Sequence, residues 1–331
     1  GAAPAKAAEA AAEGDGERPA GAGYLRRLVL ALLWFPDDEQ RFIRPTIRAA
    51  EAIIPTGVDL VYSSAPSFSS HVAALLLKRR HGIRWVAEFR DPWTDQRARH
   101  KNRIAVVERA HRWLERQCLE AADVVVAVTE GARRGLAAKL PPERRDRVLL
   151  ALNGIDAIAP ALEQRRPGPY RIVYAGTFYY NRDPRPFLAA LAALRAELGL
   201  GPDDVRVDFA GHCRTYDDVS VEAEVARHGL QDLVHFHDWM PHDAMQRMLR
   251  DADLLFLIAL GQPLQVPNKV YDYLGTRRRI LAVVDADGES ERMVRSVGGH
   301  EIVAVPAGGA ATVEATTAAL RSALLAHRRA G

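Results

Sequence analysis

The chain has 331 residues, of which 48% are hydrophobic, and its 45 lysines and arginines outnumber its 42 aspartates and glutamates by only three. A chain of this length and apolar content can bury a large core, and we expect it to fold as two domains. The small net charge gives the protein no strong positive potential that would attract a nucleic acid, so no nucleic-acid partner is expected. Two isolated cysteines, Cys118 and Cys213, form neither a disulfide framework nor a metal-ligand spacing, which favours a reducing cytoplasm.

The amino-terminal residues 1–23 are mostly alanine, glycine, glutamate and proline, without an apolar block. They do not resemble a signal peptide, and they predict a disordered, linker-like segment. The most apolar stretch, residues 28–35, is far shorter than the roughly 20 residues that span a bilayer. It predicts a core helix or an interfacial helix.

From residue 59 onward, short β-branched runs alternate with helical patterns, which is typical of parallel sheets covered by helices. The first series predicts strands at 59–63, 84–89, 124–128 and 148–152, and helices near 67–80, 103–121 and 130–139. After a turn-rich passage, the second series predicts strands at 171–175, 205–210, 233–236, 254–258, 280–284 and 301–304. Its helices are expected near 184–198, 219–228, 241–250, 268–276 and 288–296.

These two series predict an α/β protein with two doubly wound, Rossmann-like domains that face each other across a cleft. We place an N-terminal, acceptor-side domain at residues 24–157 and a C-terminal domain at residues 158–310. Residues 311–331 are expected to form a final helix that packs back on the N-terminal domain. In doubly wound sheets, ligands bind beyond the carboxyl ends of the strands, so the residues after each strand are the site candidates.

Basic residues gather between Lys78 and Arg116, with Trp85, Trp93 and Trp113 among them. One interpretation is a solvated helix face. The other is a surface that contacts anionic lipid head groups or a phosphorylated acceptor, which predicts peripheral contact with the inner face of a membrane.

The sequence lacks the motifs that are typical of dinucleotide oxidoreductases, nucleoside triphosphatases and serine hydrolases, so these three enzyme classes lose their main support. There is no Gly-x-Gly-x-x-Gly after a strand, no Gly-x4-Gly-Lys-Ser/Thr and no Gly-x-Ser-x-Gly. His235, His237, Asp238 and His242 cluster around one strand end and could imitate a metal site. Because no paired ligand spacing accompanies them, we expect these side chains to cap backbone groups or to face water.

Polar or glycine-containing sequences follow several predicted strands. Residues 90–95 place Asp91 at the edge of the first sheet, and residues 152–156 form a turn where the chain crosses to the second domain. Gly176 follows the first strand of the second domain, where a glycine allows a ligand to approach the backbone closely. Arg182 lies in the same loop.

Residues 266–274 read Val-Pro-Asn-Lys-Val-Tyr-Asp-Tyr-Leu, and their proline and asparagine predict the start of a helix. This start sets Lys269 and Asp272 one turn apart. The simpler interpretation is a surface helix with an i, i+3 ion pair. The alternative is that the helix start and Lys269 bind phosphate while Asp272 holds sugar hydroxyls. Together with Arg182, Lys269 could neutralise a diphosphate without a metal.

These motifs, in this order and spacing, resemble the family-4 retaining glycosyltransferases, which use nucleotide sugars and have the two-domain GT-B fold. The resemblance extends from about residue 36 to the carboxyl end. It rests on the runs at 59–67, 89–93, 153–156, 174–177 and 269–274. Family members begin with a strand and a glycine-containing loop that are not recognisable in this sequence, so we expect either that the sequence is a fragment or that a first βα unit is missing. We therefore expect a first domain that is incomplete at its start and less stable than the second.

The resemblance implies a hexosyltransferase-type enzyme that moves a sugar from a nucleotide diphosphate donor to a hydroxyl acceptor with retention at the anomeric carbon. Its partners would be the nucleotide sugar and a glycan or lipid-linked acceptor, in the synthesis of surface polysaccharide, glycolipid or a related glycan. No cofactor and no metal are implied. Two alternatives stay open: a non-catalytic module that binds nucleotide or glycan, and a GT-B sugar-nucleotide epimerase.

The resemblance also implies roles for individual residues. Asp272 takes the place of the second acid of the family's Glu-x7-Glu signature, which binds the donor ribose, and Leu264 stands in place of the first. Arg182 and Lys269 would stabilise the departing diphosphate, and Asp91 would lie near the transferred sugar. The other expected donor-binding residues are Gly176, Thr177, Met240, Asn268 and Val270, and the acceptor-side residues are Arg90 and Trp93.

Overall fold

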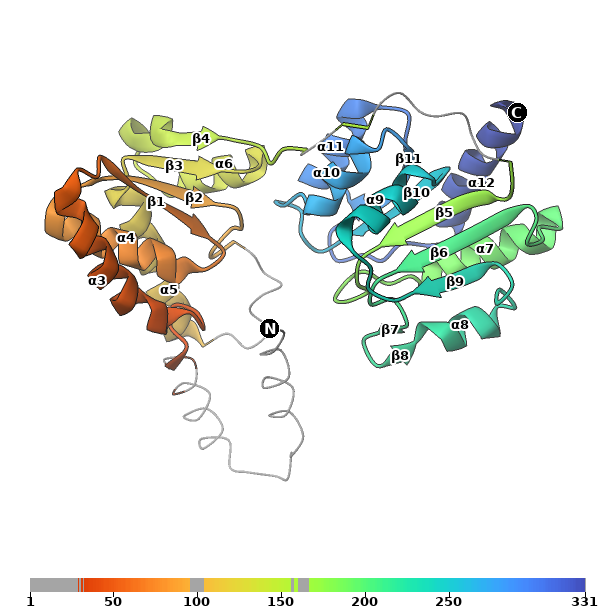
Figure 1. The fold of residues 1–331 in the computed structure, drawn as a ribbon, viewed down its shortest axis with the longest axis horizontal. Helices are drawn as coiled ribbons and strands as arrows, with labels where there is room; N and C mark the ends of the chain where they lie inside the picture. Colours follow the sequence, from red (N-terminus) through yellow and green to blue (C-terminus); the bar gives the residue numbers. More distant parts are fainter. Residues whose placement is uncertain are drawn as a thin grey trace. The chain divides into compact units, whose positions relative to one another are not determined.

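The structure is a computed structural model that describes residues 29, 31, 33–95, 104–155, 158–159 and 167–330. The predicted linker at residues 1–23 lies outside these residues, as do four members of the basic region, Arg97, Arg99, Lys101 and Arg103. The chain divides into two compact units (Figure 1). The first comprises residues 1–125 and 139–147, and the second comprises residues 126–138 and 148–331.

A four-stranded sheet lies in the first half of the chain, in the order β1-β2-β3-β4. Its strands are β1 (Leu60–Ala65), β2 (Arg84–Phe89), β3 (Val124–Ala127) and β4 (Val148–Leu150). Its helices are α3 (Ile43–Ile53), α4 (Phe68–His81), α5 (Ala105–Ala121) and α6 (Glu130–Ala138). Short 3-10 turns occupy Gln40–Phe42, Ile54–Thr56 and Pro142–Arg147. Strands β1 and β2 pair in parallel, as the helical crossover between them requires.

Helix α3 was not predicted from the sequence. It buries little apolar surface of its own, since Ile47 is its one fully buried side chain. That side chain packs against Ala73 and Leu77 of α4. Helix α4 ends at Gly82, whose left-handed backbone (φ +65°) lets its amide donate to the Lys78 carbonyl at 2.9 Å.

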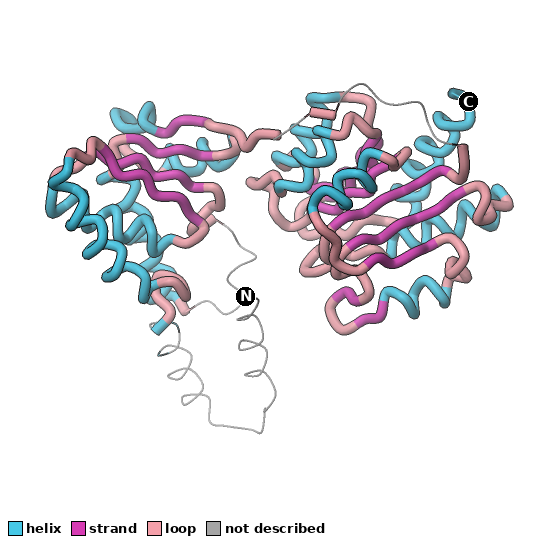
Figure 2. Tube along the Cα trace, viewed as in Figure 1, coloured by secondary structure: helices cyan, strands magenta, loops and turns pink. Residues whose placement is uncertain are grey.

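The second unit contains a six-stranded sheet, whose strands are magenta in Figure 2. The strand order is β12-β11-β10-β5-β6-β9, and every neighbouring pair is parallel. Its strands are β5 (Tyr170–Ala175), β6 (Val205–Ala210), β9 (Val234–His237), β10 (Leu254–Ala259), β11 (Arg279–Asp285) and β12 (Glu301–Val305). A small hairpin joins β7 (Thr215–Tyr216) to β8 (Val219–Ser220). The ten strands of the two parallel series lie within two residues of their predicted ends, which confirms the expectation of an α/β chain with parallel sheets.

Helices cover both faces of this sheet. The helices are α7 (Arg185–Leu198), α8 (Val221–Arg227), α9 (His242–Arg250), α10 (Asn268–Gly275), α11 (Glu289–Val297) and α12 (Val313–Ala330). Side chains of α7, α8 and α12 form one apolar core with the sheet, and those of α9, α10 and α11 form another. Strand β10 is buried along its whole length because it contributes to both cores, which explains its unbroken apolar sequence.

The final helix, α12, packs against α7 and β12 of the second unit. The expected packing of residues 311–331 on the N-terminal domain stays a prediction. Its buried side chains Leu320, Ala323 and Leu324 complete the apolar core there. None of the helices in the described part of the chain combines the length and the hydropathy needed to cross a bilayer.

Candidate active site

The strand order of the second sheet creates a crevice at the carboxyl end of β5. The chain winds outward from β5 in both directions, to β6 on one side and to β10 on the other. Strands β5 and β10 pair only at Ile172↔Leu254 and Val173↔Leu255. Beyond these pairs, the Ala175 amide donates instead to the Tyr273 hydroxyl of α10, at 2.8 Å. Such a topological switch point is where doubly wound sheets bind their ligands.

Lys269 lies in this crevice, in the first turn of α10. Its Nζ donates to the Tyr174 hydroxyl at 3.1 Å and lies 4.4 Å from the centre of the Tyr174 ring. A methyl group on Gly176 would lie 2.8 Å from the same Nζ. Gly176 also has φ +138°, which side chains rarely adopt. Both observations explain why a glycine is needed beside this lysine.

The Lys269 ammonium has no carboxylate partner within ion-pair distance among the described residues. The side chain turns toward Tyr174 of β5, so it makes a contact across the crevice instead of the ion pair with Asp272 that the simpler interpretation expects. Burial, reinforced by the nearby Arg182 guanidinium, lowers the pKa of Lys269 from 10.5 to about 7. A half-buried cation without a counter-ion among the described residues is a site that favours an anion.

Arg182 is held in the loop that follows β5. Its guanidinium stacks over the Tyr179 ring, 4.3 Å from the ring centre, and its amide donates to the Tyr179 carbonyl at 3.1 Å. The Tyr216 hydroxyl donates to the Tyr180 carbonyl and so fixes the loop to the β7–β8 hairpin. In the described part of the chain, Arg182, like Lys269, forms no ion pair with a carboxylate. Because Arg182 lies close enough to Lys269 to lower its pKa, the structure brings together the two cations that the sequence proposed for a diphosphate.

Gly211 and Cys213 contact the backbone of Gly176, and the sequence did not indicate either of them as a site residue. A Cβ on Gly211 would collide with the Gly176 carbonyl oxygen, and Gly211 itself has φ +106°. The Cys213 thiol donates to the same carbonyl at 3.3 Å. Gly211 directly follows strand β6, so a strand followed by glycine, the signal that revealed Gly176, would also have indicated Gly211.

A hollow of about 320 Å³ opens beside Gly176 at the ends of β5 and β6. Three predicted donor-binding residues line it: Gly176, Thr177 and Met240. Trp239 forms part of its rim and is 77% exposed, an unusual exposure for a tryptophan. His242, the first residue of α9, also lines it.

Asp272 lines a second hollow of about 200 Å³ between α9 and α10, together with Gln246, Arg250 and Thr276. His242 borders both hollows, so they adjoin each other around the start of α9. The exposed Asp272 and the glycine Gly176 therefore line two adjoining hollows that meet at the start of α9.

The two remaining donor-binding candidates lie at the start of α10. Asn268 is exposed, and its Oδ1 accepts from Asn153 Nδ2 at 3.4 Å. Val270 is fully buried, and its amide already donates to the Pro267 carbonyl at 2.9 Å. A phosphate oxygen would have to share that donor, so Val270 is the weakest of these candidates.

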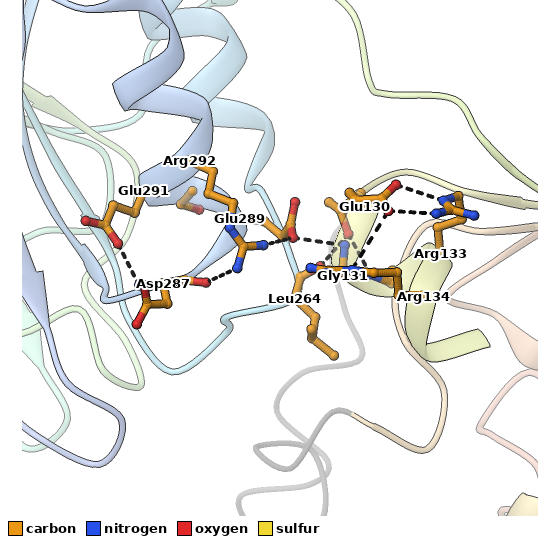
Figure 3. A network of polar contacts seen from close by, with 12 residues as sticks. Glu130, Gly131, Arg133, Arg134, Leu264, Asp287, Glu289, Glu291 and Arg292 are labelled. Carbon is orange, nitrogen blue, oxygen red and sulfur yellow. Dashed lines mark hydrogen bonds and ion pairs between the residues drawn. The ribbon is translucent and has the colours of Figure 1, made fainter. Parts of the chain in front are cut away.

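The loop that precedes α10 is fixed by polar contacts to neighbouring helices (Figure 3). The carbonyl of Leu264, the residue at the place of the family's first acid, accepts from Thr129 Oγ1 at 2.7 Å. The Glu289 amide donates to the Pro263 carbonyl at 2.9 Å, and Ser290 Oγ donates to the Gln265 carbonyl at 3.1 Å. Because the backbone of this loop is held in place, the backbone of Lys269 at the start of α10 is held in a defined position.

The three candidates of the first unit follow β2. Arg90 is exposed and Asp91 is half-buried. Trp93 is only 1% exposed, stacks on Phe68 with ring centres 4.4 Å apart, and donates to His111 Nδ1 at 3.1 Å. Its side chain belongs to the core of the unit and shapes the loop, instead of forming the loop's surface. The acceptor-side and sugar-side roles of these residues stay predictions.

One member of the histidine cluster, His237, has a structural role. His237 Nε2 bonds the carboxylate of the buried Asp208 at 2.7 Å, and Arg171 and Arg206 pair with the same carboxylate. Burial by itself would raise the pKa of Asp208, but its hydrogen bonds to Arg206, Arg171 and His237 lower it to about 2. Within the described ranges, no group of three or more histidines, cysteines and acids is arranged to hold a metal ion.

Residues 7–158 match the sequence profile of Glycosyltransferase Family 4. The predicted resemblance to the family-4 glycosyltransferases is confirmed. The match begins well before residue 36, where the recognisable motifs start, so the family's pattern reaches into the segment that predicted a linker. No curated protein sequence matches the chain.

Solved structures of glycosyltransferases and related enzymes share the architecture. Alr3699/HepE of Anabaena, solved in complex with UDP-glucose, is 13% identical and superposes over 85% of this chain and 76% of its own, with a TM-score of 0.53. Sucrose-phosphate synthase of Thermosynechococcus elongatus is 15% identical over 87% of this chain and 70% of its own, with a TM-score of 0.57. A putative UDP-N-acetylglucosamine 2-epimerase of Listeria monocytogenes is 15% identical over 88% of this chain and 71% of its own, with a TM-score of 0.52. The chain has the GT-B fold.

Proposed function

We propose that this protein is a glycosyltransferase that moves a sugar from a nucleoside diphosphate donor to a hydroxyl acceptor. The observation that carries the proposal is a pair of cations at the switch point that lack carboxylate partners among the described residues: Lys269, which lies beside Gly176, and Arg182, which is close enough to lower the Lys269 pKa. A diphosphate supplies the negative charge that this crevice lacks. The match to the family-4 profile supports a sugar nucleotide as its source.

The proposed reaction breaks the bond between the anomeric carbon of the sugar and the diphosphate oxygen. Negative charge grows on the departing diphosphate, where Lys269, Arg182 and the amides at the start of α10 stabilise it. The acceptor hydroxyl attacks the same face of the sugar and passes its proton to the leaving phosphate, which gives retention. Asp272 holds the ribose hydroxyls, and Asp91 acts near the transferred sugar. This mechanism needs no protein nucleophile.

The finer features of the proposal follow the resemblance. They are a hexose as the transferred sugar, a glycan or lipid-linked acceptor in surface polysaccharide or glycolipid synthesis, and a cytoplasmic protein at the inner face of the membrane. The basic residues between Lys78 and Arg116 support contact with anionic lipid. Co-sedimentation with vesicles that contain phosphatidylglycerol, compared with phosphatidylcholine alone, tests that contact.

A nucleotide-sugar consumption assay with a panel of acceptors tests the transferase directly. Wild-type protein should release nucleoside diphosphate only when an acceptor is present, and Lys269→Ala should lower turnover by about 100-fold or more. Unchanged turnover in Lys269→Ala would refute the assigned roles.

The epimerase alternative keeps support from the Listeria neighbour, because the fold does not separate the two activities. It predicts a change in sugar configuration without an acceptor, which NMR of UDP-N-acetylglucosamine would detect. Binding of UDP without either activity would instead favour the non-catalytic module.

A further inference from the structure

Tyr174 is a buried tyrosine with no role in the reaction outlined above, yet its hydroxyl faces the candidate catalytic lysine. We propose that Tyr174 is a positioning residue that holds the Lys269 ammonium beside Gly176 and favours its charged form. This inference rests on the proposed function, because it assigns the support of the group that receives the diphosphate.

The direction of the hydrogen bonds supports this role. The Tyr174 hydroxyl has one hydrogen, which it donates to the Thr177 carbonyl at 3.0 Å. An ammonium group has only donors, so the hydroxyl must accept from Lys269, at 3.1 Å. Burial raises the pKa of Tyr174 well above 10, so the hydroxyl keeps the hydrogen that fixes this direction. The hydroxyl therefore links Lys269 to the backbone of the loop that follows β5.

The Tyr174 ring cannot easily swing away from Lys269. Its centre lies 4.5 Å from that of Phe178 and 5.9 Å from that of Phe256, and Phe209 meets it edge-on at 6.2 Å. A side chain packed on several sides holds its polar tip within a narrow range of positions.

A tyrosine suits this position better than a carboxylate would. A carboxylate would neutralise Lys269 and compete with the phosphate, whereas a ring face and a neutral hydroxyl stabilise the cation and leave its charge for the ligand. The other groups that influence Lys269 are Arg182, which opposes its charged form, and the Cys213 thiol, which weakly favours that form. Asp272, on the same helix, lines a different hollow.

The first test measures the ionisation of Lys269 without any ligand. The chain has only five lysines, so 13Cε-lysine NMR gives a spectrum that Lys269→Arg can assign. Wild-type Lys269 should titrate near its pKa of about 7. Tyr174→Phe keeps the ring but removes the hydroxyl that accepts a hydrogen bond from the Lys269 ammonium. The charged form of Lys269 is then less stable, so its pKa should fall by about one pH unit.

Tyr216→Phe is the matched control. It too removes a tyrosine hydroxyl that donates to a backbone carbonyl of the same loop, but Tyr216 does not contact Lys269. Its Lys269 titration should equal that of the wild type. Equal titrations of Lys269 in wild type and Tyr174→Phe would overturn the inference.

The second test measures how UDP affinity depends on pH, with GDP and ADP as further probes. Affinity should fall as pH rises through the pKa of Lys269, and Tyr174→Phe should move this fall about one pH unit lower. The arginine in Lys269→Arg keeps its charge over this pH range, so the UDP affinity of this variant should not fall, whether residue 174 is tyrosine or phenylalanine. If wild type binds none of the three nucleotides, the proposed function fails, while the NMR titration still decides the role of Tyr174. If wild type binds and the Tyr174→Phe profile is unchanged, only the inference about Tyr174 fails.

Discussion

Replacing Lys269 by methionine should make the protein more stable while it abolishes activity. The ammonium lies in a partly buried crevice beside Arg182, without a carboxylate partner in the described part of the chain. A methionine of similar length can fill the space over the Tyr174 ring without a charge to desolvate. The same substitution removes the group proposed to stabilise the diphosphate, so turnover should fall by about 100-fold or more.

The size of the gain follows from the pKa of Lys269, which is 10.5 in the unfolded chain and about 7 in the folded one. Between these values the unfolded chain binds more protons, so the stability of the wild type rises with pH. At about 1.4 kcal/mol per pH unit, the Lys269 penalty at pH 6.5 exceeds that at pH 9.5 by at most about 3 kcal/mol. Partial exposure of the side chain to water reduces this difference to about 2 kcal/mol.

Scanning calorimetry of wild type and Lys269→Met at pH 6.5 and pH 9.5 measures this difference. The melting temperature of the second unit should rise by about 5 °C in the variant at pH 6.5, and by much less at pH 9.5. Lys78→Met serves as the control, because the Lys78 ammonium pairs with Asp123 at 2.7 Å. Removal of that lysine should produce no stabilisation at either pH.

Two results would refute this reasoning. A Lys269→Met variant that is less stable than wild type would mean that the contacts of the ammonium with Tyr174 outweigh the cost of its burial. A gain of equal size at both pH values would show that packing, and not the charge of Lys269, causes the effect.

Three further substitutions test other parts of the site and fold. Gly176→Ala should lower donor affinity and turnover at least about 10-fold because its methyl group meets Lys269; Gly199→Ala, which also has a positive φ but open space around it, should only lower the melting temperature. Asp272→Ala should raise the donor KM about 10-fold with little change in kcat, as steady-state kinetics would show; a fall in kcat alone would contradict a ribose contact. Asp208→Asn should cost about 3 kcal/mol at pH 7 and remove the loss of stability that wild type shows as the pH falls from about 4 to 2, measured by urea unfolding; an unchanged acid transition would contradict the low pKa of Asp208.

Much of the fold could be predicted from the sequence because its signals are local. A strand buried on both faces needs an apolar run such as that of β10, and a helix that covers the sheet needs an amphipathic repeat. Helix α3 escaped prediction because little of it is buried, and the placement of α12 depends on which core its apolar face completes. Neither property is visible in a short window of sequence.

The candidate site was predicted in part, for the same reason. Glycines and charged residues that follow strands can be read along the chain, and they indicate Gly176, Arg182 and Lys269 without reference to the sheet order. The burial of Trp93 could not be read in this way, because it depends on contacts with Phe68 and His111 from two different helices.

The sequence by itself determined that a cation, a glycine and an acid follow the strands of a second α/β unit. Only the tertiary structure decided that Lys269 turns to Tyr174, 95 residues earlier in the chain, and not to Asp272 one turn away. The physical reason is the early separation of β5 and β10, which leaves a gap at the switch point that Lys269 enters over the Tyr174 ring. Such a choice depends on sheet order, which no local pattern contains.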